Sequence, residues 1–117
     1  MKQRIALMYQ LCRKVRRDLN QTSISSVFGR AQSTISRIEA GHLEPSARDW
    51  IKFCSLFRIN PTVLIDDQLC RKTITRMLND IHRQEGIDMF GQPKPLQGRT
   101  QKLVDSAQRF LYTLEIK

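Results

Sequence analysis

Apolar residues recur at three- and four-residue steps along almost the whole chain, and no stretch alternates convincingly at the two-residue period of a strand. The first such run, Met8, Leu11, Cys12 and Val15, predicts a helix over about residues 3–17. Each segment of this kind carries an apolar stripe that must be buried against another element. We therefore expect an all-α fold.

Two glycines divide the next part of the chain into short helices. Asn20 is a favourable N-cap, and the helix that it opens ends at Gly29, where the missing side chain permits a positive φ. A second, mostly polar helix is predicted over residues 32–39 and ends before Gly41. The pattern indicates two short helices on either side of a tight turn.

Two further caps predict the helices that follow. Ser46, with Asp49 as its capping-box partner, opens a helix that runs to Phe57, and Asn60-Pro61 opens a brief fifth helix around residues 63–65. Each of the three helices that follow Asn20 has an expected apolar face. In chain order these faces are Ile24, Val27 and Phe28, then Ile35 and Ile38, then Trp50, Ile51, Phe53, Cys54 and Phe57.

The chain is strongly basic, with 20 Lys and Arg against 11 Asp and Glu in 117 residues, a net charge of +9. Residues 1–66 carry eleven basic against five acidic side chains, and residues 67–117 carry nine against six. A positive field of this size in a small domain points to a polyanionic partner, and it is stronger in the first half.

Several classes of protein are disfavoured by what the sequence contains. Cys12, Cys54 and Cys70 have no Cys-x-x-Cys spacing, so we expect buried thiols and neither disulfides nor a metal site. The two histidines and the scattered glycines match no catalytic or phosphate-binding motif, so no enzyme activity and no cofactor are expected. Without a long apolar stretch, we expect a soluble, cytoplasmic protein that does not enter a membrane.

A longer pattern covers residues 19–64. Gln21 precedes Gly29 by eight residues, the run Gln-Ser-Thr-Ile-Ser-Arg-Ile-Glu-Ala-Gly follows over residues 32–41, and Pro45-Ser46 comes next. This pattern resembles the Cro and phage-repressor family, also called XRE-like, over about residues 5–66. The resemblance implies a five-helix, lambda-repressor-like helix-turn-helix domain. Ala31 departs from it by replacing the usual Ser or Thr cap of the recognition helix.

The resemblance implies that residues 32–39 form a recognition helix that enters the major groove of double-stranded DNA. If the two isoleucines of this helix face the core, the residues left to read bases are Gln32, Ser33, Ser36 and Arg37. The expected phosphate contacts are Gln21, Arg30, Thr34, His42, Lys14 and Arg16. The family pattern also suggests that Glu39 binds a basic residue of the first helix, most simply Lys14.

Residues 67–117 form a helical extension of the predicted domain, residues 1–66. A sixth helix is expected over about residues 67–84, followed by a loop near 86–99 and a last amphipathic helix. The stripes of these two helices are Ile74, Met77, Leu78, Ile81, Leu103, Val104, Ala107, Phe110, Leu111 and Leu114. We expect the stripes to form a dimer interface; a hairpin folded back within one chain and a surface for a protein partner are the alternatives.

Together these features predict a sequence-specific regulator of transcription, a repressor that occupies a palindromic operator as a homodimer. Two alternatives remain open at this stage. The protein is an autoregulating antitoxin whose last helices also bind a toxin, or it is an adaptor whose basic face binds RNA or an acidic protein.

Overall fold

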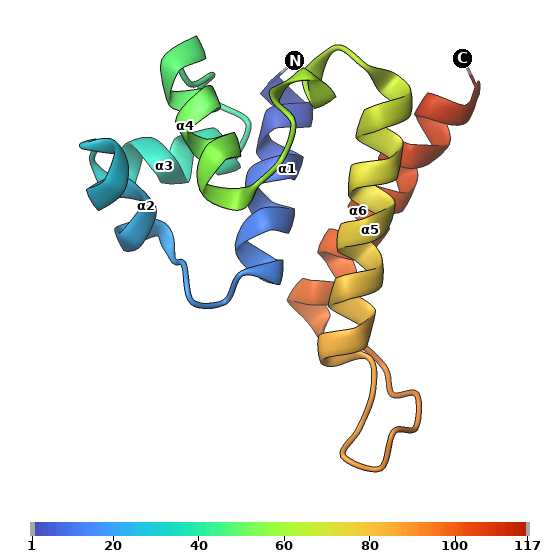
Figure 1. Cartoon of the computed structure of the whole chain (residues 1–117). Coiled ribbons are helices and arrows are strands. Elements are labelled where there is room, and N and C mark those ends of the chain that lie inside the picture. Colours follow the sequence, from blue (N-terminus) through green and yellow to red (C-terminus); the bar gives the residue numbers. More distant parts are fainter. Residues whose placement is uncertain (1, 117) are drawn as a thin grey trace.

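A computed structural model describes residues 2–116, without the side chains of residues 115 and 116, and confirms an all-α chain over that range (Figure 1). Its elements are α1 (Lys2–Val15), α2 (Gln21–Phe28), α3 (Gln32–Glu39), α4 (Ala47–Phe57), the 3-10 turn η1 (Pro61–Leu64), α5 (Asp67–Glu85) and α6 (Gly98–Ile116). None of these helices is both long and apolar enough to cross a bilayer.

Local signals set the boundaries of the short helices. Asn20 accepts a hydrogen bond from the Ser23 amide at 2.9 Å and so caps α2. Gly29, at φ +65°, ends α2, and Gly41, at φ +80°, follows α3. Ala31 makes no side-chain cap, as its residue type predicts.

The capping box predicted for α4 is only half formed. Ser46 accepts from the Asp49 amide at 3.1 Å, as expected. The Asp49 carboxylate, however, accepts from Arg30 Nε at 2.8 Å, and so connects α4 to the turn between α2 and α3. A guanidinium supplies a charged donor, which makes it a stronger partner for a carboxylate than a backbone amide.

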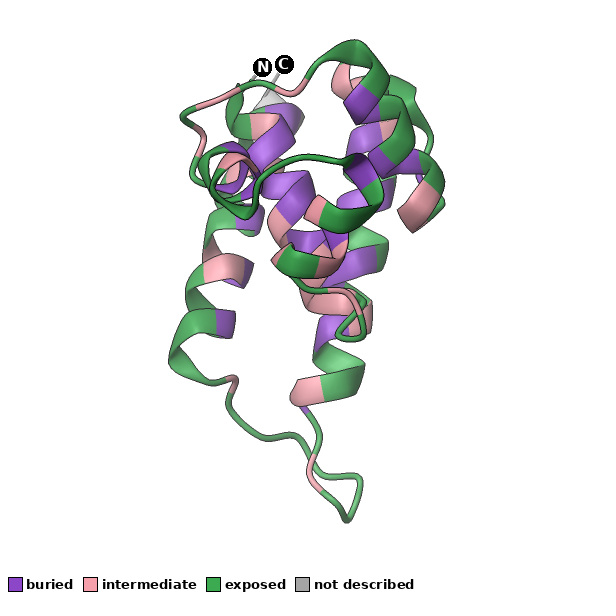
Figure 2. Ribbon diagram, turned by 90° about the vertical axis from the view of Figure 1, so that its left-hand side faces the viewer, coloured by how far each residue is buried: buried purple, intermediate pink, exposed green. Residues whose placement is uncertain are grey.

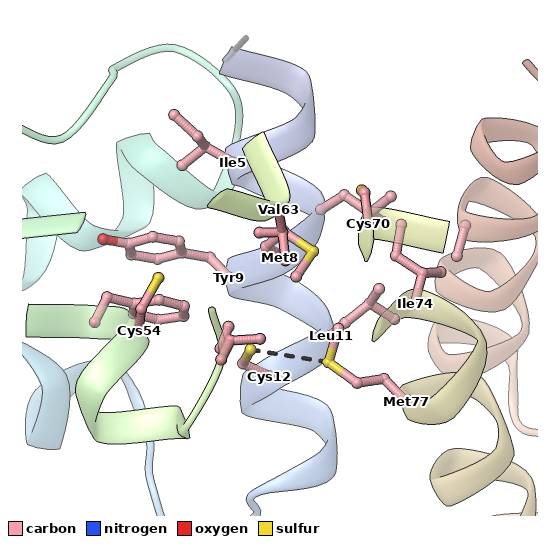
Figure 3. Close-up of a cluster of buried hydrophobic side chains, with 14 of the residues drawn as sticks. Ile5, Met8, Tyr9, Leu11, Cys12, Cys54, Val63, Cys70, Ile74 and Met77 are labelled. Carbon is pink, nitrogen blue, oxygen red and sulfur yellow. Dashed lines mark hydrogen bonds between the residues drawn. The ribbon is translucent and has the colours of Figure 1, made fainter. Parts of the chain in front are cut away.

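Helix α1 is the centre of the molecule. In Figure 1 it lies between the α2–α4 group and the pair formed by α5 and α6. Tyr9 points toward the first group, where its ring stacks on Phe53 with centroids 3.7 Å apart. On the other side Cys12 Sγ lies 3.9 Å from Met77 Sδ of α5 (Figure 3). The buried side chains thus form one continuous core on both sides of α1.

The two long helices fold back on α1 of the same chain. This arrangement is the hairpin that the sequence left as an alternative to a dimer interface. Helix α5 packs on α1, and α6 packs on α5 and reaches α1. Seven members of the two stripes are buried within the chain and are not free to form a dimer interface: Ile74, Met77, Leu78, Ile81, Val104, Ala107 and Leu114. The other three, Leu103, Phe110 and Leu111, are half-buried, and Arg4 lies over the Phe110 ring at 5.3 Å.

The expected apolar faces are correct at most positions and wrong at two. Val27 and Ile51 are 57% and 56% exposed, because each lies beside the buried stripe of its helix and not within it. All three cysteines are buried, as expected. Burial raises the pKa of the Cys54 thiol to about 12 and also raises that of Cys70. These thiols are therefore protonated and inert at neutral pH.

The connection between α5 and α6 is an ordered loop that projects beyond the helices (Figure 2). It covers residues 86–97, slightly shorter than predicted, because α6 already begins at Gly98. The Asp88 carboxylate accepts from the amides of Phe90 and Gln92, both at 2.9 Å, which fixes the turn. Phe90 and Met89 are 80% and 89% exposed at its tip.

Candidate nucleic-acid interface

Helix α3 separates its apolar and polar residues cleanly. Ile35 is fully buried and Ile38 is 3% exposed, so the helix is anchored to the core along one side. The four predicted base-reading residues, Gln32, Ser33, Ser36 and Arg37, are all exposed. They form a row of hydrogen-bonding side chains on the side of α3 that faces away from the protein, which is the chemistry that reading base edges requires.

The first residue of this row is held in place by α2. Thr22 Oγ1 lies 3.4 Å from Gln32 Oε1, a long hydrogen bond between the first turns of the two helices. Sequence reasoning missed Thr22 because its contact depends on the angle between α2 and α3. Thr22 therefore lies beside Gln32 at the exposed end of the row.

Glu39, at the other end of α3, connects three helices. Its side chain is only 9% exposed and forms an ion pair with Arg13 of α1. Gln21 of α2 donates to Glu39 Oε2 at 2.8 Å, and Gln10 of α1 donates to the Glu39 carbonyl. A buried carboxylate with this many partners fixes the position of α3 relative to α1 and α2.

The expectation that Lys14 binds Glu39 is wrong. Successive residues of a helix point about 100° apart, so when Arg13 faces α3 its neighbour cannot. Lys14 instead places its Nζ 3.2 Å from Oε2 of Glu85, at the end of α5. Arg17 pairs with the same oxygen at 3.1 Å, and Thr100 donates a hydrogen bond to the other carboxylate oxygen, Oε1, at 3.0 Å. Burial raises the pKa of Glu85, but the hydrogen bonds from Lys14 and Thr100 outweigh it, and the pKa lies below its ordinary value.

The predicted phosphate contacts are in different environments. Lys14 is drawn toward α5, and Gln21 is half-buried on Glu39. Arg30 is paired with Asp49 at 2.8 Å, although about half of its side chain stays exposed. Arg16 pairs with Asp18 at 3.0 Å on the surface, and its hydrogen bond holds the pKa of Asp18 below the usual range. Thr34 is half-buried, and His42 is exposed and forms no ion pair in the described part of the chain.

Sequence reasoning overlooked two basic residues of α4. Arg48 lies in the first turn of α4, two residues after the Ser46 cap, and Lys52 lies one turn further on. Both are exposed, and neither forms an ion pair among residues 2–116. An exposed, unpaired cation can contact a phosphate without first breaking an ion pair. This exposure marks Arg48 and Lys52 as further candidate phosphate contacts.

Comparison with known proteins yields one finding. Residues 10–64 match a family model described as helix-turn-helix. The matched segment runs from the middle of α1 to the end of η1, and it contains α2, the turn, α3 and Glu39 with all its partners. No curated protein and no solved structure matches the chain.

Proposed function

Since residues 10–64 belong to the Cro and phage-repressor-like helix-turn-helix family, we propose that this DNA-binding protein represses transcription by occupying a palindromic operator as a homodimer. Binding to double-stranded DNA and a role in regulation come with the family. The repressing role, the palindrome and the dimer are our proposal, and a repressor of this kind acts by excluding polymerase from a promoter.

The observation that carries the proposal is the exposed row on α3. The major groove of B-form DNA is about 12 Å wide and admits one helix. Arg37 can pair bidentately with guanine and Gln32 with adenine, while the two serines accept or donate to several base edges. Because Ile35 and Ile38 fix the opposite side of α3 to the core, the row keeps one orientation when it enters the groove.

The charge of the chain supports the affinity part of the proposal. Exposed basic side chains lie on the segments before and after α3, Arg30 in the preceding turn and Arg48 and Lys52 on α4. Phosphate contacts by such residues release counterions from the duplex. We therefore expect the affinity for any duplex to fall steeply as salt is raised. Discrimination between duplexes should depend on the α3 row and change less with salt.

The dimer follows from the small number of base pairs that one α3 can read. Two recognition helices on a twofold axis read half-sites about 34–36 Å apart, which doubles the information in the site. Most of the stripe residues of α5 and α6 are used inside the chain, so the dimer must form elsewhere. The exposed apolar side chains of Met89, Phe90 and Tyr112 are the candidates for that contact.

Selection of bound sites from a pool of random duplexes tests the proposal. We expect a palindromic consensus, and sedimentation of the protein on that site should give two chains per duplex. A consensus without twofold symmetry, bound by one chain, would contradict the dimer. Failure to enrich any sequence, together with equal retention by single-stranded RNA, would instead support the adaptor alternative, because A-form RNA hides its major groove.

A further inference from the structure

Helix α6 runs antiparallel to α1 but leans against it only in part, and two adjoining grooves remain between them. The first, about 460 Å³, lies between Leu7 of α1, Phe110 of α6 and the C-terminal end of α3 at Glu39. The second, about 400 Å³, lies between Arg13 and Lys14 of α1 and Arg99 of α6. Gln10 lines both grooves, so the two adjoin at this residue, and together they are called the α1–α6 furrow.

The walls of the α1–α6 furrow carry more positive than negative charge. Four cations line it: Arg13, Lys14, Arg99 and Arg109. Two of them are neutralised, Arg13 by Glu39 and Lys14 by Glu85. The two cations of α6 form no ion pair in the part of the chain that the structure describes. A furrow between low-dielectric walls concentrates this excess charge and attracts anions.

The first groove also carries an apolar strip beside its polar residues. Ala6, Leu7 and Phe110 line it beside the end of α3, so a ligand can bury carbon atoms there while its charged group reaches the cations. We propose that the α1–α6 furrow binds a small amphiphilic anion, a molecule with a phosphate or carboxylate head and a short hydrocarbon body. The head contacts Arg99 and shares Arg13 and Lys14 with their carboxylate partners, and the body lies along Leu7 and Phe110.

The same furrow is connected to the recognition helix. Arg13 lines it and is also the ionic partner of Glu39, which holds Gln21 of α2 and ends α3. An anion bound to Arg13 competes with Glu39 for the guanidinium. Glu39 is 7% exposed, and among residues 2–116 Arg13 is the cation that pairs with it, so α3 loses part of what fixes it to α1. The bound anion therefore lowers the affinity for DNA, a step that rests on the proposed function.

Calorimetric titration with hexyl phosphate tests the site. Inorganic phosphate supplies the head alone and hexanol the body alone, and all titrations are done at equal ionic strength. We expect hexyl phosphate to bind with 1:1 stoichiometry and more tightly than either part. Arg99→Gln should weaken it about tenfold or more, because a charge-assisted hydrogen bond to the head is lost.

Lys102→Gln is the matched control. Lys102 is exposed on α6 and lines neither groove, and its replacement removes the same single positive charge as Arg99→Gln. It should change the affinity for hexyl phosphate less than about twofold. Equal weakening by both substitutions, or binding of inorganic phosphate as tight as that of hexyl phosphate, would show a general charge effect and overturn the site.

A second measurement separates this inference from the proposed function. Affinity for the selected duplex is measured with and without hexyl phosphate, in the unaltered protein and in Arg99→Gln. We expect weaker duplex binding with the anion in the unaltered protein and no such change in Arg99→Gln. If the unaltered protein binds the duplex normally and hexyl phosphate does not change that affinity, the link between the anion site and DNA binding is overturned, but the site itself is not. Loss of duplex binding in the absence of any anion would count against the proposed function instead.

Discussion

Residues 20–64 and the α5–α6 hairpin are both helical and both pack on α1, yet their sequences specify structure in different ways. In the first region nearly every boundary has its own residue, such as Asn20, Gly29 or Ser46. In the hairpin, the sequence marks two long amphipathic helices but not the surface that covers them. The comparison shows that caps and turns fix where a helix begins and ends, whereas an apolar stripe leaves its partner open.

The same contrast applies to charge. In the first region, the exposed face of α3 keeps its side chains available for a ligand. Near the hairpin, Lys14 and Arg17 are held by Glu85 and join α1 to α5. Basic residues that look equivalent in the sequence thus have different roles.

The largest effect should come from the core of the hairpin. Ile74 is fully buried between α5 and α1, so Ile74→Ala should lower the free energy of unfolding by about 2–5 kcal/mol. Ile24→Ala, at a fully buried position of α2, is the matched change in the other region. Urea unfolding followed by the fluorescence of the single tryptophan, Trp50, measures both.

Because the two regions share one core, both substitutions should shift the same single transition. Two separate transitions, or a Trp50 signal that ignores Ile74→Ala, would show that the hairpin folds independently of the DNA-binding region.

The next largest effect should be on the affinity for DNA and not on stability. If Arg37 reads a base, Arg37→Ala should weaken binding to the selected duplex by about 1–3 kcal/mol and change binding to random duplexes little. Arg71→Ala removes an exposed arginine from α5 and serves as the control. Filter binding or fluorescence anisotropy measures both. An equal loss on selected and random duplexes would make Arg37 a phosphate contact.

A smaller effect is expected at the end of α4, near the junction of the two regions. Arg58 caps α4 with φ +57° and ψ +48°, a left-handed conformation that favours glycine. Arg58→Gly should relieve that strain and raise the free energy of unfolding by about 0.5–1 kcal/mol, after the extra flexibility of glycine in the unfolded chain is subtracted. Thermal unfolding measures the change, and a lowered melting temperature would contradict it.

The smallest effect is a pH dependence in the connection between α1 and the hairpin. The pKa of Glu85 lies below its ordinary value of 4.5, so its stabilising effect is complete above that pH and is lost as the pH falls through the lowered value. Glu85→Gln should cost from a few tenths to about 1 kcal/mol at pH 7. The difference between the two proteins should shrink in acid; a constant difference from pH 7 to pH 3 would contradict this assignment.

Much of the site was predictable from the sequence because it depends on local periodicity. Once Ile35 and Ile38 are assigned to the core, the exposure of Gln32, Ser33 and Arg37 follows from helix geometry alone. The partners of Glu39 were not predictable in the same way. A shift of one residue along α1 rotates a side chain by about 100°, and the choice between Arg13 and Lys14 depends on how α1 is packed on both sides.

Caps, glycines and apolar spacing act within a few residues, so the amino-acid order alone specifies the all-α class, the approximate position of each helix, the helix-turn-helix pattern and the polar row on α3. Tertiary structure alone decided that α5 and α6 cover α1 within one chain, that Arg30 holds Asp49, and that a furrow remains beside α6. These features depend on the angles and distances between helices far apart in the sequence, and such geometry results from packing the whole core at once.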